Sequence, residues 1–178
     1  MSVGPTLATA RLILRPPAAE DFPAFADYMA DPVTRFVGGP AGPELSWRMW
    51  SVIAGAWIVN GFSMFSVIER DTGKWIGRIG PWVPKGWPGD EVGWGLVTPA
   101  QGKGYATEAA TACIDWAFDH LGWDGVIHCI APDNVASQEV AKRLGSANRG
   151  PGKMPPPVDH YEVDIWGQTK AQWKARSR

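Results

Sequence analysis

The sequence is short of the features that mark several specialised classes of protein. Its net charge is −1 over 178 residues, without a block of like charges, which argues against a dedicated nucleic-acid surface. It has no apolar run of about 18 residues, so no membrane-spanning helix is expected. The start, MSVGPTLATARLIL, has no basic segment followed by an apolar one, so no signal peptide is expected. We therefore expect a cytoplasmic protein with no nucleic-acid or membrane partner.

Cysteine and histidine are also scarce. The two cysteines, Cys113 and Cys129, form no CxxC pair, and we interpret them as reduced core thiols rather than as a disulfide or a catalytic pair. The three histidines are His120, His128 and His160, and none belongs to an HExxH or a Cys/His array. The spacing therefore predicts no metal site.

What the chain does contain is enough apolar material for one globular domain. Hydrophobic residues make up 45% of the 178 residues, which suits a single domain over 1–178 with a core over about 7–167. The polar tail, 168–178, is expected to form a frayed helix. Tryptophan is unusually common, at 11 residues. Large core side chains explain this number, although an aromatic-lined pocket is an open alternative.

Hydrophobic periodicity and turn residues predict one mixed α/β sheet domain. Strands are expected over 10–15, 62–69, 75–82, 91–97, 126–131 and 161–166, and helices over 19–29, 44–60, 103–121 and 134–144. In the helix over 103–121 the apolar residues repeat at alternating spacings of three and one, which is typical of a helix buried along one stripe. Gly93 and Gly95 in the strand over 91–97 predict a bulge or a close backbone approach.

The stretch QGKGYATE, residues 101–108, is a glycine-bearing turn directly before a helix. It fails the Walker A pattern, because Lys103 is followed by Gly104 rather than by Ser or Thr. It fails the dinucleotide fingerprint, because Thr107 stands at the third glycine position. It does match Gln/Arg-x-x-Gly-x-Gly/Ala, through Gln101, Gly104 and Ala106.

That pattern is the pyrophosphate-loop signature of GCN5-related N-acetyltransferases, and the sequence resembles this family and its RimJ/RimL-like branch. Three further stretches are similar to family segments, in the same order: TLATARLILRP at 6–16, GDEVGWGL at 89–96 and DNVASQEVAKRLG at 133–145. The resemblance covers about residues 7–167. It implies a mostly antiparallel central sheet flanked by helices, with two strands splayed to receive acyl-CoA.

The resemblance also implies an activity. Members of the family move an acetyl group from acetyl-CoA directly to a primary amine, without a metal. The acceptor is a protein N-terminal α-amine or a small-molecule amine. Two rival functions stay open: a non-catalytic acyl-CoA-binding protein, and a structural or partner-binding domain that matches by chance. Whether the protein forms a homodimer, as family members often do, also stays open.

A cofactor site is expected at the turn, where glycines expose backbone N–H groups and the helix N-terminus adds its positive dipole end. The residues expected to bind acetyl-CoA are Leu96, Val97, Gln101, Gly102, Lys103, Gly104, Tyr105, Ala106, Thr107, Asn134 and Ser137. Backbone groups of Leu96 and Val97 would hold the pantetheine arm, and a backbone N–H there would stabilise the oxyanion. Asn134 is equally suited to capping a helix.

Candidate catalytic residues follow from the same resemblance. Glu91 is the leading general base, acting through water with a pKa raised by burial, unless it is only a solvated strand-end carboxylate. Asp90 and His160 are alternative bases. Ser137 is a candidate donor to the leaving thiolate, because Ala141 stands where many family members have a tyrosine acid.

The acceptor pocket is expected between the segments 30–50, 82–90 and 150–161, which are rich in proline, glycine and tryptophan. Its candidate aromatic walls are Trp47, Trp50, Trp82 and Trp87. Such walls favour an apolar amine or one held by cation–π contact. The identity of the amine stays open.

Overall fold

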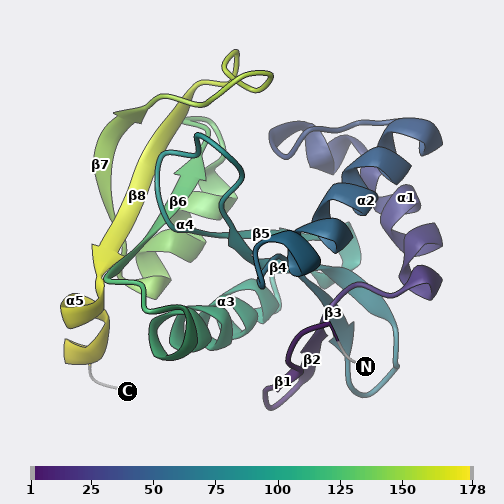
Figure 1. The fold of residues 1–178 in the computed structure, drawn as a ribbon, viewed down its shortest axis with the longest axis horizontal. Coiled ribbons are helices and arrows are strands. Elements are labelled where there is room, and N and C mark those ends of the chain that lie inside the picture. Colours follow the sequence, from purple (N-terminus) through teal and green to yellow (C-terminus); the bar gives the residue numbers. More distant parts are fainter. Residues whose placement is uncertain (1–2, 177–178) are drawn as a thin grey trace.

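The computed structural model describes residues 3–176 and contains one eight-stranded mixed sheet flanked by helices (Figure 1). The strands are β1 (Leu7–Ala8), β2 (Leu12–Arg15), β3 (Phe65–Glu69), β4 (Trp75–Trp82), β5 (Glu91–Leu96), β6 (Gly125–Ile130), β7 (Ala147–Gly152) and β8 (Val163–Thr169). The α-helices are α1 (Phe22–Ala30), α2 (Pro43–Val59), α3 (Tyr105–Trp116), α4 (Val135–Leu144) and α5 (Lys170–Ala175). The strand order is β1-β2-β3-β4-β5-β6-β8-β7.

One pairing in this sheet differs from all the others. Neighbouring strands run antiparallel except β5 and β6, which are parallel. These two strands share a single register pair, Glu91 with Ile127. Beyond that pair they continue to Leu96 and Ile130 without pairing. The predicted mixed, mostly antiparallel sheet is confirmed, and its two halves separate at the carboxyl ends of β5 and β6.

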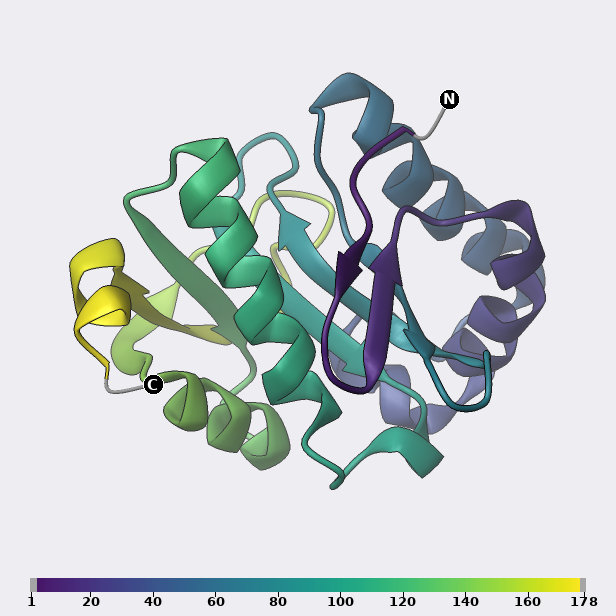
Figure 2. The same cartoon turned by 90° about the horizontal axis from the view of Figure 1, so that it is seen from below.

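Helices cover both faces of the sheet. Figure 2 shows α3 crossing one face, and the predicted apolar stripe is buried there along α3 and the π-helical turn Ala117–Leu121 that continues it: Ala109, Ala110, Cys113, Ile114, Ala117 and Phe118. On the opposite face, α1 and α2 enclose a second apolar cluster that includes Phe25, Trp50 and Met64. Between residues 3 and 176, no helix has both the length and the apolar character needed to cross a membrane.

Two elements near the C-terminus differ from the predictions. β7, with the sequence ANRGPG, was not predicted because glycine and proline disfavour strands, but it is an edge strand, where proline is tolerated. The tail forms the ordered helix α5 rather than a frayed one. Thr169 and Gln172 form a capping box. The buried Trp173 donates its indole N–H to Asp115 Oδ1 at 2.7 Å.

The predicted bulge at Gly93 and Gly95 is wrong, because β4 and β5 pair without a register shift from Gly77–Leu96 to Trp82–Glu91. What approaches the two glycines is side chains rather than another backbone. A Cβ atom on Gly95 would lie 2.3 Å from Tyr28 Oη, and one on Gly93 would lie 2.9 Å from Met64 Cε. The two glycines therefore make room for side chains that cross β5.

Gly95→Ala should destabilise the protein by about 1–3 kcal/mol, because the added methyl group overlaps the Tyr28 hydroxyl. Chemical denaturation of the variant measures this loss. In a Tyr28→Phe background the same substitution should cost less, since the nearest overlapping atom is gone. An equal cost in both backgrounds would show that the hydroxyl is not the obstacle.

Candidate functional site

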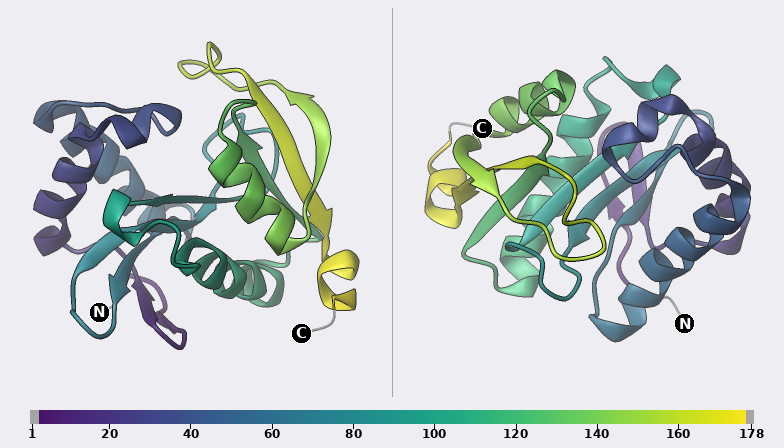
Figure 3. Two further views of the ribbon diagram at one scale, coloured as in Figure 1. Left: turned by 180° about the vertical axis from the view of Figure 1, so that it is seen from behind. Right: turned by 90° about the horizontal axis from the view of Figure 1, so that it is seen from above.

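A cavity of about 520 Å³ opens where β5 and β6 separate. Its walls come from α2, β4, β5, β6, the start of α4 and the β7–β8 connection. That connection extends beside the β4–β5 connection (Figure 3), and a Cβ atom on Gly86 would lie 3.3 Å from Pro155. The cavity brings Glu91 of β5 together with Asn134 and Ser137, which lie at the start of α4, the helix that follows β6.

Glu91 is a buried carboxyl at the cavity wall, only 6% exposed. Its Oε1 accepts from the Cys129 backbone N–H at 3.0 Å, and its Oε2 accepts from the Trp87 indole N–H. Burial raises the pKa of Glu91, and the hydrogen bonds from Cys129 and Trp87 and the charge of Arg78 offset this only in part. Glu91 is thus not a solvated strand-end carboxylate, and its raised pKa makes its ionised form a stronger proton acceptor than an ordinary glutamate.

The two alternative bases lie outside the cavity wall. Burial, and to a lesser degree the charge of Asp124, raise the pKa of Asp90, whose carbonyl accepts from the Ile127 N–H at 2.9 Å. His160 is exposed, and its Nδ1 lies 3.1 Å from the Pro157 carbonyl oxygen. Neither side chain is brought together with Ser137, so the geometry favours Glu91 over both.

Asn134 and Ser137 lie at the start of α4, on the cavity wall. Asn134 Oδ1 accepts from the Ser137 backbone N–H at 3.2 Å, so Asn134 caps the helix as its alternative reading suggested. Ser137 Oγ accepts from the Trp94 indole N–H at 3.1 Å. Because the indole can only donate, the Ser137 hydroxyl hydrogen stays available to another acceptor.

His128 and Cys129 stand side by side on β6 but differ in role. His128 is fully buried, with Nδ1 2.7 Å from the Val92 carbonyl and Nε2 3.0 Å from Ser146 Oγ. Burial lowers its pKa to about 4, so it is a neutral structural residue. Both cysteines are free thiols, but only Cys113 lies in the core. Cys129 lines the cavity beside Glu91, which corrects its placement as a core thiol.

The predicted aromatic walls divide into two groups. Trp82 and Trp87 line the cavity. Trp50 is buried between α1 and α2, and Trp47 is exposed on α2 and stacks edge-on against Phe22. Sequence reasoning missed Arg78, a buried cation on β4 that also lines the cavity. Its one sequence signal was a charge inside the strand WIGRIGPW.

The turn before α3 has the open backbone that an anion site requires. Gly102 and Gly104 have φ values of +73° and +81°, the left-handed region that favours glycine. A Cβ atom on Gly102 would meet nothing within 4 Å. Within residues 3–176 the N–H groups of Gly102, Lys103 and Gly104 have no acceptor. With the first N–H groups of α3 they form a donor set suited to phosphate oxygens.

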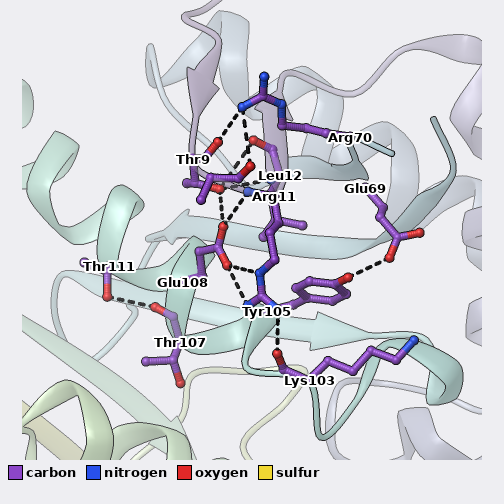
Figure 4. A network of polar contacts seen from close by, with 11 residues as sticks. Thr9, Arg11, Leu12, Glu69, Arg70, Lys103, Tyr105, Thr107, Glu108 and Thr111 are labelled. Carbon is purple, nitrogen blue, oxygen red and sulfur yellow. Dashed lines mark hydrogen bonds and ion pairs between the residues drawn. The ribbon is translucent and has the colours of Figure 1, made fainter. Parts of the chain in front are cut away.

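A polar network connects this turn and the start of α3 to the N-terminal strands (Figure 4). Arg11 Nη1 donates to the Lys103 carbonyl at 3.0 Å, and the Arg11 guanidinium pairs with Glu108 at 2.7 Å. The Tyr105 hydroxyl donates to Glu69 Oε1 at 2.7 Å. The side chain of Tyr105 therefore anchors the turn, and only its backbone N–H is left for a ligand.

The end of β5 is tied to the same turn. Gln101 Nε2 donates to the Leu96 carbonyl at 3.0 Å, so the Gln101 side chain positions the turn. The Val97 N–H donates to the Ile76 carbonyl of β4 at 3.0 Å and is not free for a ligand. Because alternate residues of a strand direct their backbone groups to the same edge, Leu96 and Trp94 face the gap toward β6.

The comparison with family models matches residues 11–147 to the acetyltransferase (GNAT) domain. The chain belongs to the GNAT family of acetyltransferases. An acetyltransferase from Agrobacterium tumefaciens str. C58 shares 35% identity with it at a TM-score of 0.81, over 93% of this chain and 95% of that one. The open turn before α3 and the cavity therefore lie within a fold that this chain shares with acetyltransferases.

Other GNAT relatives are more distant or only partly matched. The N-acetyltransferase p20 of Bacillus licheniformis is 28% identical over 149 residues, covering 82% of this chain and 84% of p20. YnaD of Bacillus subtilis is 35% identical over 86 residues, and the chain spans about half of it, 51%. RimL, a ribosomal L7/L12 α-N-protein acetyltransferase, shares the fold at a TM-score of 0.76 and 15% identity, over 93% of this chain.

The raised pKa of Glu91 should be visible in the pH dependence of stability. A carboxyl whose folded pKa lies above its ordinary value of 4.5 binds its proton more tightly when folded. Its contribution to the free energy of unfolding therefore falls as pH rises above about 4.5. Glu91→Gln cannot ionise, so its stability relative to wild type should increase from pH 4.5 toward neutral. Denaturant titrations of both proteins at several pH values measure the difference, and a decrease over this window would contradict the raised pKa.

Proposed function

We propose that the chain is an acetyl-CoA-dependent N-acetyltransferase that acts on a primary amine. The observation that carries the proposal is the placement of a buried carboxyl, Glu91, in the cavity between the separated ends of β5 and β6, with an open turn of N–H donors after β5. Ligands of α/β sheets bind outside the carboxyl ends of strands. Membership of the GNAT family supports the same reaction class.

The turn fits the pyrophosphate of coenzyme A. Gly102 presents no side chain and a Cβ there would enter open space, so an anion can approach the backbone closely. The N–H groups of residues 102–106 and the dipole of α3 would hold it. The exposed Lys103 would add a charge. Leu96 and Trp94, facing the gap, would hold the pantetheine arm as a neighbouring strand does, and Asn134 and Ser137 would border it.

Glu91 would prepare the acceptor amine. An ammonium has no lone pair, so one proton must leave before attack, and the Glu91 carboxylate accepts it directly or through water. The neutral nitrogen then forms a bond to the acetyl carbon as the carbon–sulfur bond breaks. A backbone N–H of β5 that faces the gap would stabilise the developing oxyanion.

The leaving thiolate also needs a proton, and Ser137 is the candidate donor. Its hydroxyl hydrogen is not used by Trp94, because the indole N–H donates to Ser137 Oγ and cannot accept. The second proton of the attacking nitrogen would restore the hydroxyl. The products are the N-acetylated amine and the CoA thiol, and Glu91 returns its proton to solvent, so one proton is released for each ammonium acetylated.

Acetyl-CoA should raise the melting temperature of the protein. A ligand at a free concentration of about 100 times its dissociation constant adds about 2.7 kcal/mol to the free energy of unfolding. For a domain of this size, that gain raises the melting temperature by roughly 5–10 °C. Gly104→Trp should abolish the rise, since an indole would block the turn. Gly122→Trp is the matched control, because Gly122 has a similar φ of +71° in open space at the other end of the helical segment. An equal loss of the rise in both variants would count against a site at the turn.

Glu91→Gln should lower turnover by roughly 100-fold while acetyl-CoA affinity stays near wild type, because the amide cannot take the proton. Steady-state release of free thiol with a panel of amines measures turnover, and the acetyl-CoA-induced thermal shift reports binding. Ser137→Ala tests the donor role in the same assay. Unchanged turnover in Glu91→Gln would remove the base role, and unchanged turnover in Ser137→Ala would leave solvent as the donor.

The rival function is acyl-CoA binding without catalysis, which Ala141 at the position of the family's tyrosine acid favours. The same thiol assay separates the two. Sustained amine-dependent release of thiol excludes a binding protein, whereas a thermal shift with acetyl-CoA and no release from any amine supports one.

A further inference from the structure

Arg78 is a buried cation without a matching anion. It lies in the middle of β4, is only 8% exposed, and lines the cavity. Its Nη1 donates to the Met64 sulfur, and its Nε has no partner among residues 3–176. A thioether is a weak acceptor. The guanidinium is therefore desolvated by the protein but not neutralised by it.

Glu91, whose charge acts on Arg78 across the cavity, forms no ion pair with it. The oxygens of Glu91 accept from Cys129 and Trp87, and none of the ion pairs found over residues 3–176 includes Arg78. Burial lowers the pKa of the guanidinium, against the opposing influence of Tyr28 and Glu91, but an arginine keeps its proton in proteins. Burying an unpaired charge costs free energy, and buried charges in proteins are usually paired with an opposite charge.

A carboxylate carried by the acceptor would supply that anion. A carboxylate matches the planar fork of a guanidinium. An α-amino acid carries its amine one carbon away from its carboxylate, so one molecule can present the amine toward Glu91 and the carboxylate toward Arg78. The other walls of the cavity are mostly apolar and include Trp82, Met49 and Met154. An apolar side chain would pack there.

We propose that Arg78 binds the carboxylate of the acceptor and that the acceptor is a free α-amino acid with an apolar side chain. The proposal rests on the proposed acetyltransferase function and selects between its two acceptor classes. A protein N-terminus carries a neutral amide where the free amino acid carries a carboxylate, so it would leave Arg78 unpaired. The phosphates of coenzyme A have their own donors at the turn before α3.

The test compares three amines that share one apolar group: L-phenylalanine, L-phenylalaninamide and phenethylamine. Thiol release gives kcat/KM for each, and the pair L-leucine and isopentylamine repeats the comparison with a smaller side chain. A hydrogen-bonded charge pair should favour each amino acid over its analogues that lack the carboxylate by roughly 10- to 100-fold. The preference should appear mainly in KM, because Arg78 binds the part of the acceptor that does not react.

Two variants connect the preference to Arg78. Arg78→Met removes the charge at similar volume and should reduce kcat/KM for L-phenylalanine to the level of phenethylamine. Arg48→Met is the matched control, because Arg48 lines the same cavity but is exposed and solvated. It should keep the preference. The wild-type comparison decides the question even if Arg78→Met does not fold.

Equal kcat/KM values for the amino acids and for their analogues that lack the carboxylate would overturn the proposal while leaving the acetyltransferase function intact. If no amine releases thiol, the proposed function fails, and calorimetry then tests Arg78 separately. With coenzyme A present, the wild type should bind L-phenylalanine at least about 10-fold more tightly than phenethylamine, and equal or absent binding would overturn the proposal.

Discussion

The structure depends on one constraint, the single register pair between β5 and β6 at Glu91 and Ile127. A sheet that continued to pair would close the gap between its halves and leave no cavity. A sheet that lost this pair would separate Glu91 from the Cys129 N–H that holds its carboxyl. The pair lies at the base of the gap, and a helix, α3 or α4, follows each of the two separated strands. The cavity takes its position from this pair, whereas the turn before α3 and the start of α4 are held by their own side-chain contacts.

The cavity combines two groups whose electrostatic requirements are opposite. Glu91 is desolvated, so its neutral form is favoured, whereas Arg78 is desolvated but keeps its charge. Hydrogen bonds from Cys129 and Trp87 hold the carboxyl without neutralising the guanidinium. Burial of polar groups at this cost is common in functional sites and rare in a core that serves stability alone. Under the proposed function, the two groups would act on the charged parts of the acceptor, its ammonium and its carboxylate.

Much of the fold was predictable, because it follows from local patterns. The stripe of α3 and the bounds of β4 come from spacing alone, and the turn before α3 comes from Gln101, Gly104 and Ala106. The rest depends on contacts between distant segments. The bulge was predicted wrongly because Gly95 of β5 instead leaves space for the side chain of Tyr28, which comes from helix α1. Arg78 was missed because its burial depends on strands and helices that surround it only in three dimensions.

The polar network at the turn also bears on the order of folding. The contact between Arg11 and the Lys103 carbonyl joins residues 92 positions apart. Closing a chain segment of that length is slow compared with forming a helix turn. The turn is therefore expected to become fixed only after the N-terminal strand pair has docked beside α3, later than the local helix turns. Because Leu12 and Leu14 of β2 are fully buried in the main core, a misplaced N-terminus would disturb the core together with the turn.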